Sequence, residues 1–138
     1  MNNFITLTEN EIVNYDLMDN EHRELVSLVN EIFSKIGKLD RDENLTYIKK
    51  LVDHIRKHFD SEENCMKQFK YYGYISHKLE HDRFYNKLLS FSVKVEEEKT
   101  GITLDLLQSI KTWFFNHLEM NDKKCAKHFI ESLASETN

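Results

Sequence analysis

The chain has 138 residues and a formal net charge of −5, with 40% hydrophobic and 31% charged residues. A chain of this length buries a real hydrophobic core, and its many aromatic residues exclude intrinsic disorder. The lysines are interleaved with acids, which argues against nucleic acid as a partner because phosphate binding requires clustered basic side chains. We therefore expect one globular domain over residues 1–138 that binds no nucleic acid.

The N-terminal stretch shows no basic segment followed by an apolar one, and no apolar run approaches the ~18 residues that a membrane span requires. These features predict a cytoplasmic protein with no membrane partner. The two cysteines, Cys65 and Cys125, are too few for a disulfide framework and do not form a C-x-x-C motif. We expect reduced thiols and favour no redox role for them.

Apolar residues recur at three-and-four spacing in four long segments that contain no proline, which predicts four amphipathic helices. Short connections between long helices favour antiparallel neighbours. The predicted fold is all-α, an up-down-up-down antiparallel four-helix bundle. In chain order, the sequence predicts an extended N-terminal arm over 1–18, helices over about 19–36, 42–69, 75–97 and 103–120, and a short helical C-terminal tail over 123–138, with the bundle covering about 19–122.

Histidines and acids recur on the core-facing stripes of these predicted helices, and an antiparallel bundle brings all of them to the same end. Positions i and i+4 differ by only ~40° around a helix, so a pair at that spacing converges on one site. The residues concerned are His22 on the first helix, His58 and Glu62 on the second, His77 and His81 on the third, and His117 and Asp122 on the fourth.

The last pair breaks this spacing. His117 and Asp122 are five residues apart and diverge on an ideal α-helix. If both serve one site, the fourth helix must loosen there or carry a π-type turn.

The composition of this layer predicts a metal centre. Burying two carboxylates without cations costs on the order of several kcal/mol each, and metal ions remove that cost. Five imidazoles and two carboxylates are too many ligands for one tetrahedral zinc and too nitrogen-rich for magnesium or calcium. Two six-coordinate irons fit better. If both carboxylates and one oxo or hydroxo group bridge them, a three-and-two division of the histidines leaves one iron with an open position.

Four segments together resemble the hemerythrin family, in particular the single-domain bacterial hemerythrins. The resemblance covers about residues 12–125. Its motifs are DNEH at 19–22, HFDSEE at 58–63, HKLEH at 77–81 and WFFNHLEMND at 113–122.

This resemblance implies a four-helix bundle and reversible binding of dioxygen at one open iron. It also implies the ligand set: His77, His81 and His117 on one iron, His22 and His58 on the other, and Glu62 and Asp122 bridging both. Trp113, Phe114, Leu118 and Met120 are candidates to line the oxygen pocket, although a plain core role is an equal alternative.

The chain departs from the family pattern away from these ligands. The tryptophan often found in the arm and the glycine often found before the first histidine are absent, and Cys125 replaces a common aromatic residue. His54 lies one turn before His58. We favour a contact with a ligand residue, or packing in the core, over a role for His54 as an eighth ligand. These departures bear on pocket access and oxygen affinity, not on metal binding.

The predicted function is oxygen binding for storage, delivery or sensing, with a reductase partner that the sequence does not identify. A di-iron peroxidase or oxidase is the alternative, and an iron-storage module a further one. Oxygen-activating di-iron enzymes use carboxylate-rich sites with Glu-x-x-His motifs, and no histidine here has a glutamate three residues before it. The histidine-rich ligand set therefore favours binding over catalysis.

Overall fold

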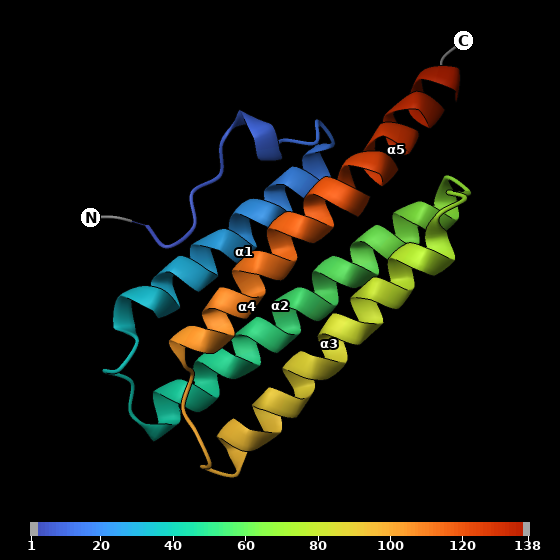
Figure 1. Ribbon diagram of the computed structural model, residues 1–138. Coiled ribbons are helices and arrows are strands. Elements are labelled where there is room, and N and C mark those ends of the chain that lie inside the picture. Colours follow the sequence, from blue (N-terminus) through green and yellow to red (C-terminus); the bar gives the residue numbers. More distant parts are fainter. Residues whose placement is uncertain (1–2, 137–138) are drawn as a thin grey trace.

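The computed structural model describes residues 3–136, and within that range all regular structure is helical (Figure 1). Helices α1 to α4 form an antiparallel bundle, which confirms the predicted fold. The elements are η1 (Glu9–Glu11, a 3₁₀ turn), α1 (Asp16–Lys35), α2 (Arg41–Gln68), α3 (Tyr74–Glu96), α4 (Leu104–His117), η2 (Leu118–Asp122, a π-helical turn) and α5 (Lys123–Glu136).

Local sequence signals set the helix boundaries. Asp40 and Glu43 form a capping box that satisfies free backbone N–H groups at the start of α2, and the Thr103 side chain accepts a single hydrogen bond from the Leu106 N–H at the start of α4. Gly37 adopts a φ of 80° just after α1, a left-handed conformation that favours glycine and stops the helix. At Gly73 an added Cβ would lie 2.7 Å from the ring of Tyr71, so any other residue in the turn between α2 and α3 would require that ring to shift.

The N-terminal arm is shorter than predicted. The chain turns at Asn14, whose φ is 63°, and α1 begins at Asp16 rather than at residue 19. The Asp19 carboxylate accepts hydrogen bonds from the backbone N–H groups of Val13 at 2.9 Å and Asn14 at 3.0 Å, which ties the arm to the first turn. The arm passes alongside α1, where the Asn30 side chain bonds the backbone of residue 5 (Figure 1).

The fourth helix is longer than predicted, because α4, η2 and α5 follow one another without a break (Figure 1). The predicted short tail is a helix that buries Cys125, Ala126 and Phe129, and this apolar stripe explains why it docks rather than frays. His128 donates to the Phe69 carbonyl at 2.7 Å. The last two residues of the predicted tail, 137–138, lie outside the described residues.

Candidate metal centre

All seven predicted ligands lie at one end of the bundle, and each is at most 4% exposed. They come from every helix of the bundle, as an antiparallel arrangement requires. His22 lies on α1, His58 and Glu62 on α2, His77 and His81 on α3, His117 at the end of α4, and Asp122 at the end of η2.

The three C-terminal histidines of the set form the first cluster. His117 Nε2 lies 3.0 Å from His77 Nε2 and 3.1 Å from His81 Nε2. Glu62 Oε1 lies 3.0 Å from His77 Nε2 and 3.2 Å from His81 Nε2. Asp122 Oδ1 lies 3.1 Å from His117 Nε2 and 3.3 Å from His77 Nε2. Each carboxylate therefore lies beside two of the imidazoles.

The second cluster contains the other two histidines and the other oxygens of the same carboxylates. Glu62 Oε2 lies 2.7 Å from His58 Nε2 and 3.7 Å from His22 Nε2. Asp122 Oδ2 lies 3.3 Å from His22 Nε2. Each carboxylate thus turns one oxygen toward each cluster, which is the orientation of a ligand that bridges two ions.

The spacing of the first cluster suits a six-coordinate ion. With ligand atoms about 2.1 Å from an ion, neighbouring ligands lie about 3.0 Å apart on an octahedron and about 3.4 Å apart on a tetrahedron. Six of the distances among His77, His81, His117 and the two shared carboxylates run from 3.0 to 3.3 Å. The donor set therefore fits an octahedral metal better than tetrahedral zinc.

Unsatisfied polar atoms also point to metal. The buried atoms that lack a hydrogen bond of good geometry, although other ligand atoms of the two clusters lie near them, include both ring nitrogens of His22, Oε2 of Glu62 and Oδ1 of Asp122. Such atoms are rare in proteins because each loses its hydration without compensation. These residues fit a pair of metal ions.

An outer layer of glutamates fixes the ring orientation of three histidines. The Nδ1 atoms of His58, His81 and His117 lie 3.2, 2.9 and 3.1 Å from carboxylate oxygens. A neutral imidazole that donates its Nδ1 proton to such a carboxylate has its Nε2 lone pair free for a metal. The acceptors are Glu21 for His58, Glu63 for His81 and Glu80 for His117.

The sequence analysis missed these three glutamates, although they share a simple signal. Each glutamate is adjacent in sequence to a proposed ligand on its own helix and accepts a hydrogen bond from a proposed ligand on the next helix. A step of one residue turns a helix by about 100°, so the neighbour of a core-facing residue faces the adjacent helix. Glu21 adjoins His22, Glu63 adjoins Glu62, and Glu80 adjoins His81.

The π-helical turn at Leu118–Asp122 resolves the five-residue spacing of the last pair. Its wider turn holds one more residue than an α-helical turn, so Asp122 faces the same way as His117. Their side chains meet at 3.1 Å. The predicted departure from α-helix at this point is confirmed.

Without metal, the cluster is a network of opposite charges. Burial opposes a charge on His58, but the carboxylates of Glu62 and Glu21 outweigh it and raise its pKa to about 10. Burial likewise opposes a charge on His77, and Asp122 with Cys125 and Glu62 raises its pKa to about 12. Although burial favours the neutral form of Glu62, His58 and the other imidazoles hold its pKa well below the usual range. Metal binding must therefore displace protons.

The remaining candidates fall in different places. His54 is half-buried with Nε2 3.4 Å from the Glu21 carbonyl, so it contacts the outer layer and belongs to neither metal-binding cluster. Burial lowers the pKa of His54.

The ring of Phe114 packs edge-on against His22 at 5.2 Å between centroids, on the side of the two-histidine cluster. Leu118 is 1% exposed.

Two proposed pocket residues lie elsewhere. Met120 is 62% exposed, because the π-helical turn directs it outward, so its predicted place in a closed oxygen pocket is wrong. Trp113 stacks on His117 with centroids 4.3 Å apart, so it belongs to the side of the three-histidine cluster. Cys65 and Cys125 are buried free thiols, as expected, and burial raises the pKa of Cys125 to about 12.

Known proteins share both the sequence pattern and the fold. The family description "Hemerythrin HHE cation binding domain" matches residues 13–128. The chain belongs to the hemerythrin family. It is 30% identical to a bacteriohemerythrin of Clostridium acetobutylicum over 114 residues, which covers 79% of this chain and 88% of that protein. It is 33% identical to the myohemerythrin of Sipunculus nudus over 105 residues, which covers 75% of this chain and 82% of that protein.

A crystal structure of wild-type hemerythrin superposes with a TM-score of 0.87 at 24% identity, covering 91% of this chain and 98% of that one. This likeness supports the shared hemerythrin fold. Within residues 3–136, no helix has the length and apolar character to cross a membrane.

Proposed function

We propose that this chain holds two irons and binds dioxygen reversibly. The observation that carries the proposal is the division of the ligand atoms. Three imidazoles gather on one side of two carboxylates and two on the other, and each carboxylate turns one oxygen to each side. One metal would thus have fewer protein ligands than its partner, which leaves room for a small molecule.

When bound, the irons supply the electrons and the open position that dioxygen needs. The protein residues hold and orient them. Glu62 and Asp122 would bridge, while His77, His81 and His117 would bind one iron and His22 and His58 the other. Glu21, Glu63 and Glu80 would keep three of the imidazoles in the tautomer that binds metal.

Apolar side chains would protect the bound state by excluding water. Phe114 packs against His22 and Leu118 is buried between two proposed ligands along the chain. A dry site limits the proton and solvent access that leads to irreversible oxidation of the irons. We therefore propose that Phe114 and Leu118, rather than Met120, exclude water from the site and so limit irreversible oxidation of the irons.

The test is an oxygen titration of the anaerobically reduced, iron-loaded protein followed by visible absorption. We expect colour to appear with oxygen and to disappear under inert gas over repeated cycles. Prompt, irreversible oxidation together with rapid turnover of peroxide would instead support a di-iron peroxidase or oxidase.

The apolar wall has its own test. Leu118→Asn is expected to speed the irreversible oxidation of the reduced protein in air by about tenfold while two irons stay bound, because it admits water to a dry site. Leu79→Asn is the matched control, since Leu79 is 47% exposed on α3. Equal oxidation rates in the two variants would remove Leu118 from the protecting wall.

A further inference from the structure

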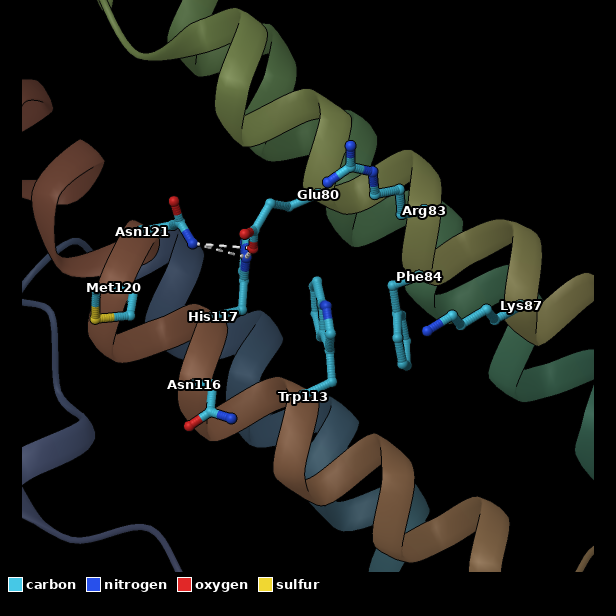
Figure 2. A pocket seen from close by; sticks show the side chains of 9 residues that line it. All are labelled: Glu80, Arg83, Phe84, Lys87, Trp113, Asn116, His117, Met120 and Asn121. Carbon is cyan, nitrogen blue, oxygen red and sulfur yellow. Dashed lines mark hydrogen bonds and ion pairs between the residues drawn. The ribbon is translucent and has the colours of Figure 1, made fainter.

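A surface hollow of about 300 Å³ lies between α3 and the end of α4, directly outside the three-histidine cluster (Figure 2). Its wall includes His117, whose ring is also a proposed iron ligand, and the aromatic rings of Trp113 and Phe84. Ligand sites are typically concave, with an aromatic lining and a few polar groups, and this hollow has the size of the smaller ones.

The hollow reaches the outer layer of the metal centre at its most exposed point. Glu80, which accepts from His117 Nδ1 at 3.1 Å, has a side chain that is 44% exposed. By contrast, the side chains of Glu21 and Glu63 are each 8% exposed. A molecule from solvent can therefore approach the metal ligands here more closely than beside either of the other two glutamates.

Stacked aromatic rings connect the hollow to the metal centre. His117 stacks on Trp113 with centroids 4.3 Å apart and planes 12° apart, and Trp113 stacks on Phe84 at 4.2 Å and 16°. Both faces of Trp113 are thus covered, and its edge meets the hollow (Figure 2). Close π-stacked rings couple electronically better than a gap or aliphatic side chains, so this column is a suitable path for electrons.

Two cations beside the column lack partners. Arg83 and Lys87 are exposed on α3, one turn apart, and neither forms an ion pair within residues 3–136. The only carboxylate that lines this hollow among the described residues, Glu80, already accepts from His117 and from Asn121 at 3.1 Å. On a chain with a net charge of −5 these two side chains form a local positive site, which attracts a phosphate or carboxylate.

We propose that this hollow binds a reduced flavin carrying a phosphate, of the flavin mononucleotide type, and that the flavin reduces the oxidised irons. Arg83 and Lys87 bind the phosphate, and an edge of the flavin ring meets Trp113. Each iron accepts a single electron, so its donor must release electrons one at a time. A reduced flavin does this, whereas a nicotinamide releases a hydride. The electron path then runs through Trp113 and His117.

The reaction balances without a further reagent. Flavin hydroquinone gives one electron to each of two ferric ions, becomes oxidised flavin and releases two protons, and two ferrous ions result. This step rests on the proposed di-iron function, but the binding site does not. Binding can therefore be measured on the metal-free chain, and its outcome is independent of oxygen binding.

Binding is tested by fluorescence quenching of oxidised flavin mononucleotide titrated with the metal-free protein. We expect saturable quenching, with the dissociation constant raised about tenfold or more in Arg83→Gln/Lys87→Gln, because two charge-assisted contacts are lost. Lys49→Gln/Lys94→Gln changes the net charge equally at exposed sites away from the hollow and should bind like the unmodified chain. Riboflavin, which lacks the phosphate, should bind weakly to every protein.

No saturable quenching, or equal affinity in both double variants, would overturn the site. If Arg83→Gln/Lys87→Gln binds flavin mononucleotide as weakly as the unmodified chain binds riboflavin, the contact between these two side chains and the phosphate is supported.

Electron transfer is tested by anaerobic mixing of the ferric protein with reduced flavin mononucleotide. We expect the rate to reach a plateau with flavin concentration. Trp113→Leu should lower the plateau, which is reached at saturating flavin and so does not depend on affinity, about tenfold or more, and Trp113→Phe should restore most of it because a ring again fills the gap. An unchanged plateau in a folded, iron-loaded Trp113→Leu protein would overturn the path, while the binding site would stand on its own measurement.

Discussion

At the scale of single residues, the proposed centre depends most on the carboxylates that face both clusters. Glu62 Oε1 and Oε2 lie 3.0 Å from His77 and 2.7 Å from His58, so the side chain belongs to both halves of the site. His54 lies about one helical turn before His58 on α2, yet it contacts a backbone carbonyl instead. Sequence spacing alone does not separate these two roles, whereas the direction of the side chain does.

We expect Glu62→Ala to reduce bound iron from two ions to fewer than one per chain, since it removes a bridge and leaves buried imidazoles unopposed. His54→Ala is the control and should keep both irons, because only an outer contact is lost. Metal analysis of the purified variants measures both. Loss of iron from His54→Ala with retention in Glu62→Ala would refute the ligand assignment.

The outer glutamates act through the histidines they orient. Glu63 is 2.9 Å from His81 Nδ1, and its removal would free that ring to turn and to take the wrong tautomer. We expect Glu63→Ala to weaken iron binding by about 10- to 100-fold, as is typical when such a partner is lost. Competition with a chelator gives the affinity. Glu24→Ala, at an exposed site on α1, should change nothing, and an equal loss in the two variants would point to net charge instead of orientation.

At the scale of elements, the most informative feature is the π-helical turn of η2. Such a turn amounts to one extra residue in an α-helix, so removing one residue from it should leave the helices on both sides nearly in place. His117 and Asp122 would then have the four-residue spacing that His58 and Glu62 already have on α2.

We therefore expect deletion of Glu119, an exposed residue of the turn, to preserve two irons per chain and the helix content. Deletion of the exposed Thr112 within α4 is the contrast. It rotates His117 by about 100° relative to the residues before it and should abolish iron binding. Circular dichroism measures the helix content of the two deletion variants, and metal analysis measures their irons per chain. If both deletions lose iron equally, the turn does more than correct the spacing.

The elements also show how far the sequence alone determines this structure. Periodicity located every bundle helix, and the five-residue spacing of His117 and Asp122 required the departure from α-helix that η2 provides. The continuation into α5 was underestimated, because its buried stripe of Cys125, Ala126 and Phe129 is small and gives a weak signal. The outward direction of Met120 could not be read from α-helical spacing, since the π-helical turn changes the register after it begins.

At the scale of the whole molecule, one hydrophobic core runs through the bundle and reaches α5. The metal-binding layer interrupts that core with charged and polar groups. In the metal-free chain these groups stabilise one another only while the imidazoles are protonated and the carboxylates are not. The fold and the metal centre are therefore linked through protons.

The direction in which stability changes with pH follows from the pKa shifts of the clustered groups. A histidine with a raised pKa stabilises the fold fully below its unfolded value of about 6.5, and the stabilisation is lost as the pH rises through the folded value. For His58 that value is about 10. Glu62 has a lowered pKa, so its contribution is present above an unfolded value of about 4.3 and is lost as the pH falls. The metal-free chain should thus be most stable at about pH 4.5 to 6.5.

Metal binding stabilises the chain more as the pH rises, which is opposite to the pH dependence of the metal-free chain. The reason is that iron requires deprotonated imidazoles and competes with protons for them. We expect the melting temperature of the metal-free chain to fall between about pH 6.5 and 9, while the gain in melting temperature from bound metal grows over the same range. The Cys125 thiol, with a pKa raised by burial to about 12, does not titrate in this window. Thermal unfolding of both forms at successive pH values measures the two curves, and a metal-free melting temperature that rises toward pH 9 would show that the clustered histidines are neutral when the metal is absent.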